Sequence, residues 1–78
     1  MNRAVGADTL NAAETRRFVE AIDLMRAAKV ADSVHSAPIR DGADRLVEVR
    51  FYSDSNGQHP IGVVHIAADG SLGRFERL

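Results

Sequence analysis

Two dipeptides, Asn56-Gly57 and Asp69-Gly70, constrain the fold of this chain more than any other feature. Asn-Gly and Asp-Gly favour two-residue type I′ hairpin turns, because these residues tolerate the positive φ that both central positions need. Alternating apolar and polar residues flank each dipeptide. The pattern predicts three antiparallel strands over residues 45–53, 61–68 and 71–78.

The two turns together predict one strand register. If both loops contain two residues, Val49 lies opposite Val64, and Val64 lies opposite Phe75. Because side chains alternate between the two faces of a strand, one face of this sheet is then almost wholly apolar. We expect this inner face to contain Val47, Val49, Phe51, Val64, Ile66 and Phe75.

The same register predicts an opposite, outer face that is half apolar and carries charges at its centre. Large apolar side chains that cluster on an open sheet face are typical of a docking surface. A small chain without disulfides or a metal also often gains stability by association. The residues predicted to form an interface are Leu46, Arg50, Tyr52, Ile61, Val63, Leu72, Glu76 and Leu78.

The first half of the chain predicts a helix that follows an arm. Residues 1–10 show no periodicity and are predicted to be a flexible N-terminal arm, whereas residues 11–78 form a single α+β domain. Asn11 and Glu14 have the spacing of a capping box, so a helix is expected from Ala12. Its apolar stripe, at spacings of three and four, consists of Phe18, Ala21, Ile22, Met25 and Ala28.

The helix is expected to end between Lys29 and His35. Residues 34–40 fit either a fourth strand, at a sheet edge that tolerates Pro38, or an irregular connector. The helix stripe is the only large apolar surface available to cover the inner face of the sheet. The predicted fold is therefore α+β, with one N-terminal amphipathic helix packed on a three- to four-stranded antiparallel meander as a two-layer sandwich.

This order of elements, with the turn Ala68-Asp69-Gly70-Ser71 before the last strand, resembles a PepSY-type module. The resemblance covers most of the chain as topology. It implies a helix followed by antiparallel strands, and it carries no functional residue onto this sequence.

Composition excludes several classes of function. Lys and Arg number 10 against 11 Asp and Glu, without a long basic run, which argues against nucleic-acid binding. Cysteine is absent, so disulfides and thiolate metal sites are excluded. The apolar stretches are far too short for a membrane span, and residues 1–10 lack the pattern of a secretory signal. We expect a cytoplasmic protein that uses no cofactor and contacts no membrane.

Catalytic chemistry finds little support in the motifs. The three histidines, His35, His59 and His65, lack a metal-ligand spacing, and no Gly-x-Ser-x-Gly elbow is present. We therefore predict no catalytic residue and no metal site. An alternative ligand site is the predicted row of Glu48, His65 and Arg74, in which a carboxylate could orient an imidazole as a general base.

Three hypotheses of function follow from these patterns. The leading one is a non-catalytic protein-interaction module, homodimeric, that acts by binding another protein through the outer face. The second is a small-ligand-binding or catalytic protein that uses the row of Glu48, His65 and Arg74. The third is an RNA-binding sheet that presents Tyr52, Arg50 and Arg74, although Glu48 and Glu76 offset the two arginines.

Overall fold

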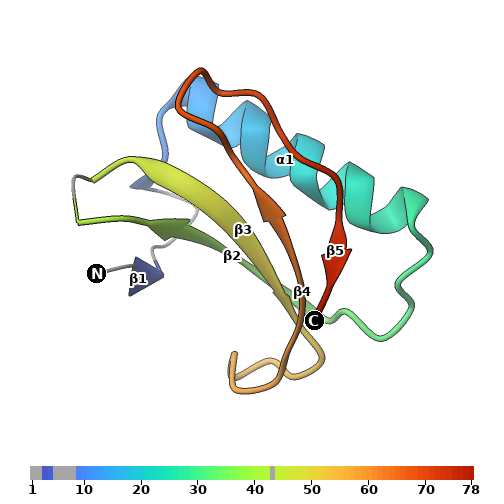
Figure 1. Cartoon of the computed structure of the whole chain (residues 1–78). Helices are drawn as coiled ribbons and strands as arrows, with labels where there is room; N and C mark the ends of the chain where they lie inside the picture. The colour runs from blue at the N-terminus through green and yellow to red at the C-terminus, as the bar shows by residue number, and fades with distance from the viewer. Residues whose placement is uncertain (1–2, 5–8, 43) are drawn as a thin grey trace.

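A computed structural model describes residues 3–4, 9–42 and 44–78 of the chain. One helix, α1 (Ala12–Ala27), accompanies an antiparallel sheet, so the fold is α+β with the helix near the N-terminus (Figure 1). The strands are β1 (Arg3–Ala4), β2 (His35–Arg40), β3 (Leu46–Tyr52), β4 (Pro60–His65) and β5 (Glu76–Arg77), and they are neighbours in chain order.

Of residues 34–40, which fitted either a strand or a connector, His35–Arg40 form β2. This strand is not at the sheet edge along its whole length, because β1 pairs with it through Arg3 opposite Arg40 and Ala4 opposite Ile39. The predicted arm of residues 1–10 contributes this short strand. Residues 1–2 and 5–8 of that arm lie outside the described residues, so its predicted flexibility, like the domain division at residue 11, stays a prediction.

The start of α1 is the predicted capping box. The Asn11 carboxamide oxygen accepts from the Glu14 amide at 2.8 Å, and Glu14 Oε1 accepts from the Asn11 amide at 3.1 Å. The expected end between Lys29 and His35 is wrong by a short distance, since α1 ends at Ala27. Ala28 is the C-cap, and Lys29 takes a left-handed conformation, φ 59°, which halts a right-handed helix.

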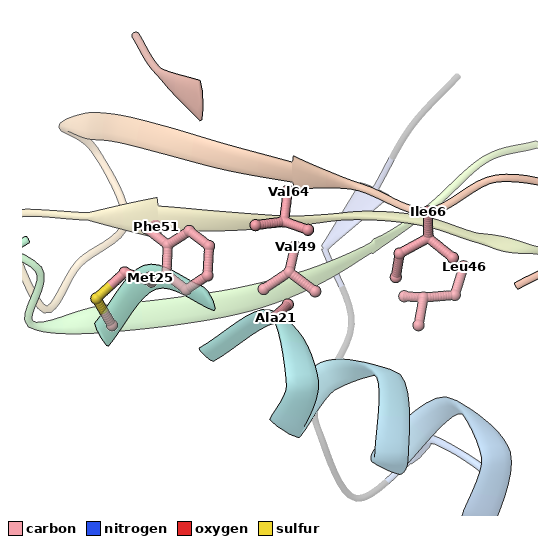
Figure 2. Packing of buried hydrophobic residues seen from close by; sticks show 7 residues of the cluster. All are labelled: Ala21, Met25, Leu46, Val49, Phe51, Val64 and Ile66. Carbon is pink, nitrogen blue, oxygen red and sulfur yellow. The ribbon is translucent and has the colours of Figure 1, made fainter. Parts of the chain in front are cut away.

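The hydrophobic core lies between α1 and one face of the sheet. Ala21 and Met25 of the helix cluster with Val49, Phe51 and Val64, which point toward the helix in Figure 2. The predicted inner face is confirmed at these three strand positions and at Ile66 and Phe75. The described residues that complete the cluster are Leu10, Phe18, Ile22, Val30, Leu46, Ile61 and Leu72.

Polar contacts tie the helix to the sheet at its first turns. Arg40 of β2 donates from Nη1 to Glu14 Oε2 at 2.6 Å and from Nη2 to Glu14 Oε1 at 2.8 Å. This hydrogen-bonded guanidinium holds the pKa of Glu14 below its usual value. One turn later, Arg17 Nε donates to the Gly70 carbonyl at 2.6 Å. Helix, β2 and the β4–β5 turn are thereby held in one orientation.

Both predicted hairpin turns differ in detail from the structure. Only the glycine of each dipeptide has positive φ, at Gly57 and Gly70, so neither turn is type I′. The Asp54 carboxylate organises the first loop by accepting from the amides of Gln58 and His59. In the second, Ala67 accepts from Gly70 and pairs with Ser71, as in a three-residue loop that ends on a left-handed glycine.

Each longer turn shifts the register by one residue, and an irregularity in the sheet restores it. Tyr52 pairs with Pro60 instead of the expected Ile61, but Phe51 pairs with Gly62 as predicted. Likewise Ile66 lies opposite Leu72, whereas Val63 lies opposite Glu76 as predicted. The register is therefore as expected at the centre of the sheet and displaced at its ends.

Candidate interaction surface

Irregular pairing decides which side chains reach the outer face. The β2–β3 register shifts between Ile39 and Arg40, which pairs Arg40 with Leu46 and leaves Val47 as an extra residue. Such a bulge turns the neighbouring side chains to the opposite face. Leu46 therefore belongs to the core under α1, and Val47 packs on the other side, so the predicted faces of these two residues are wrong.

The predicted outer-face positions of two further residues, Ile61 and Leu72, are also wrong. Ile61 is the extra residue opposite the Phe51–Tyr52 step, and it packs against the main core cluster. Leu72, displaced by the longer β4–β5 turn, lies opposite Ile66 and joins the same cluster. Burying an aliphatic side chain stabilises a fold by about 1.5–3 kcal/mol. This exceeds the roughly 1 kcal/mol of the one strand hydrogen bond that a bulge interrupts.

The outer face carries an apolar cluster of different composition, which is itself buried within the chain. Ala37 and Ile39 of β2 form a second buried cluster with Tyr52 of β3, and Val47 packs against it. Sequence reasoning missed Ala37 and Ile39, although their spacing of two within residues 34–40 is the signal of a strand face. Val63 and Leu78 continue the apolar surface across β4 to the chain end, where the Leu78 side chain is 69% exposed.

The remaining predicted interface residues, Arg50, Tyr52, Val63, Glu76 and Leu78, share this outer face. We define the outer surface as Ala37, Ile39, Val47, Glu48, Arg50, Tyr52, Val63, His65, Glu76 and Leu78.

An ion pair lies at the centre of the outer surface. Arg50 Nη2 lies 3.0 Å from Glu48 Oε2, and Glu48 is only 8% exposed. Burial of Arg50 works against its charged form, but its hydrogen bond to Glu48 and the Glu48 charge outweigh this, so the pKa of Arg50 is raised. A carboxylate buried to this degree needs such a partner. The pair fixes both side chains above the apolar residues.

The alternative ligand site is brought together only in part. Glu48 and His65 are direct cross-strand partners, as predicted, and they line a hollow of about 260 Å³ with Arg50, Pro60, Val63 and Leu78. The Glu48 carboxylate accepts from Arg50 through Oε2, and no hydrogen bond among the described residues joins it to His65. Arg74 is not among these lining residues. It lines another groove, beside Glu20 and Asp23 of α1.

The other histidines lie apart from this hollow. His35 stacks obliquely on Tyr52 with ring centroids 5.6 Å apart, and exposed His59 lies 3.6 Å from an Asp54 oxygen. Across residues 3–4, 9–42 and 44–78, no group of three or more His, Asp or Glu side chains is placed to hold a metal ion. No helix within those ranges combines the length and apolar character needed to cross a bilayer.

No protein-family model, curated protein or solved structure matches this chain. The PepSY-type resemblance accordingly rests on element order alone. The function must be argued from the outer surface and from the grooves that the fold leaves open.

Proposed function

We propose that this chain is a non-catalytic interaction module that pairs with a second copy of itself through the outer surface. The proposal is carried by the second apolar cluster, Ala37, Ile39, Val47 and Tyr52, which lies apart from the main core and is already largely buried within one chain, with Ala37, Ile39 and Tyr52 only 2–7% exposed. It continues through Val63 to the exposed Leu78. Leu78, at the margin of this surface, offers the exposed apolar side chain that a partner can cover.

Charge supports a second copy as the partner. A two-fold interface brings a surface against itself, so each charge must meet its complement on the same patch. The outer surface carries Arg50 and Glu76 in one row across Val63, and Glu76 has no ion-pair partner among the described residues. In an antiparallel arrangement of two such faces, Glu76 of one copy can approach Arg50 of the other, which it then shares with the Glu48 already bound there. A surface of one sign would not allow this.

The other two functions find less support on this surface. The hollow of about 260 Å³ at His65 is smaller than the roughly 300–1,000 Å³ of most ligand pockets. For RNA, an open sheet would need free cations beside its aromatic residue, whereas Arg50 is bound to Glu48 and Arg74 lines another groove. A different protein on the outer surface is the alternative occupant, and the mass measurement below separates it from a second copy.

The test is the mass in solution by light scattering over a range of concentrations. The parent is expected to approach twice 8.5 kDa at high concentration. Leu78→Asp places a charge on the exposed edge of the outer surface and is expected to lower the dimer fraction. Val19→Asp is the matched control, because Val19 is half exposed on α1, in the layer on the other side of the sheet.

Glu76→Arg supplies a second variant that leaves apolar contacts intact. It is expected to weaken the dimer by placing like charges face to face, and the loss is expected to shrink as salt is raised. A parent that stays at 8.5 kDa throughout would refute pairing. A dimer that Val19→Asp disrupts and Leu78→Asp leaves intact would place the interface elsewhere.

A further inference from the structure

A groove of about 540 Å³ lies between the last turns of α1 and the start of β2. Its apolar lining comes from Ile22, buried Met25 and Val30, and Val34 borders it with 63% of its surface exposed. Arg26, Lys29 and His35 also line it, and no Asp or Glu is among its lining residues. The volume lies within the roughly 300–1,000 Å³ range of small-molecule sites.

The two permanent cations of this groove are uncompensated. Neither Arg26 nor Lys29 forms an ion pair or side-chain hydrogen bond with any described residue. Asp32, three residues after Lys29, is bound instead to Arg77, with Nη2 and Oδ2 3.0 Å apart. Asp23, three residues before Arg26, lines another groove. A strip of apolar surface thus meets two free positive charges at one end of the fold.

Lys29 occupies the position after the C-cap of α1. Its φ of 59° lies in the left-handed region that ends many helices and that glycine adopts most easily. Lysine at this position ends α1 and also keeps a cation at the groove.

The groove therefore combines an apolar lining with two cations that have no acidic partner among the described residues.

We propose that this groove binds a small amphiphilic carboxylate. The hydrocarbon part of the ligand lies against Ile22, Met25 and Val30, and its carboxylate meets Lys29 and Arg26. Carboxylate oxygens accept charge-assisted hydrogen bonds from both cations, and the apolar part leaves water as it covers the lining. The site is independent of pairing through the outer surface, since it depends on residues of α1 and the segment that follows it.

The test titrates the ¹⁵N-labelled chain with decanoate below its micelle-forming concentration and follows the amide resonances. Saturable shifts are expected at the lining residues 22–36. Acetate, which lacks the tail, and decyltrimethylammonium, which carries the opposite charge, serve as the two control ligands, and neither is expected to saturate the site. Absence of a saturable shift with decanoate, or equal binding of the cationic ligand, would overturn the proposal.

Variants then separate binding from folding. Lys29→Gly is expected to weaken decanoate about five- to tenfold, the effect of losing one exposed charge-assisted hydrogen bond. Its Tm is expected to stay equal or rise, because glycine relieves the strained φ. Arg26→Ala, which leaves the backbone at residue 29 unchanged, is expected to weaken binding similarly. Arg16→Ala removes a cation outside the groove and is the control. Parent-like affinity in both Lys29→Gly and Arg26→Ala would refute the assignment.

Discussion

Gly62 of β4 is the position where one added carbon should disturb the core most. A Cβ built there would overlap Phe75 Cζ, lie 2.5 Å from Phe75 Cε1 and lie 3.1 Å from the Glu76 carbonyl oxygen. Ordinary contact between carbons begins at about 3.5 Å. Gly62→Ala therefore requires the Phe75 ring to withdraw, and that ring packs on Phe51 with centroids 5.5 Å apart.

The expected loss of unfolding free energy in Gly62→Ala is the balance of destabilising and stabilising contributions. Overpacking a core costs about 1–3 kcal/mol, and a displaced aromatic pair loses roughly a further 0.5–1.5 kcal/mol. Against this, alanine in a strand interior is better than glycine by about 0.5–1 kcal/mol. We expect Gly62→Ala to lower the free energy of unfolding by about 1–3 kcal/mol, a large share of the stability of a small domain. Urea denaturation followed by circular dichroism measures it.

Two further variants identify the cause. In a Phe75→Leu background the ring tip is absent, so adding Gly62→Ala is expected to lower the free energy of unfolding only slightly. The coupling energy from the double-mutant cycle is then expected to be close to the loss that Gly62→Ala causes in the parent. Gly73→Ala is the matched control, because its Cβ would meet only the His65 carbonyl oxygen at 3.7 Å. It is expected to change stability by less than about 0.5 kcal/mol. Equal costs of Gly62→Ala in the two backgrounds would refute the reasoning.

Three other outcomes are expected from the packing and the helix start. Leu46→Ala should lower the free energy of unfolding by about 2–3 kcal/mol in urea denaturation, because Leu46 lies in the core. A change below about 0.5 kcal/mol would mean that Leu46 faces outward. Asn11→Ala should lower the free energy of unfolding by about 1 kcal/mol in the same assay, because α1 loses its N-cap. An unchanged free energy of unfolding would contradict the role of Asn11 as N-cap. Glu14 has a lowered pKa in the folded chain, so its contribution is present above the unfolded value of 4.5 and is lost as pH falls through the lower folded value. Glu14→Gln should therefore make acid unfolding less steep over that window, as thermal melts at successive pH values would show; an unchanged slope would refute the link to Arg40.

Much of the fold could be predicted from local patterns. The capping box needs only Asn11 and Glu14 three residues apart, and the helix stripe needs only the spacing of Phe18, Ala21, Ile22 and Met25. At the sheet centre, the alternation of Val49, Phe51 and Val64 predicts both the register and the face that α1 covers. These features are readable because each depends on residues close together or on a period of two or 3.6.

The outer surface could be predicted only in part. Val63 lies on the predicted face because its pairing with Arg50 and Glu76 is regular. Tyr52 lies there because its pairing with β2 is regular, although its partner in β4 is Pro60 and not the predicted Ile61. Ala37 and Ile39 were missed because residues 34–40 fitted a strand and a connector equally well. The groove at Lys29 has no signal of its own in the sequence, since it forms where the helix end, a loop and the first residues of β2 meet.

The sequence by itself determined the helix, the central register and the sheet face that α1 covers. Tertiary structure decided the faces of Leu46, Val47, Ile61 and Leu72, at the strand ends where the turns are longer than two residues. The physical reason is that a side chain's alternation is a local property, whereas a bulge forms when burial beneath α1 outweighs the strand hydrogen bond that it interrupts. That balance exists only once helix and sheet are in contact.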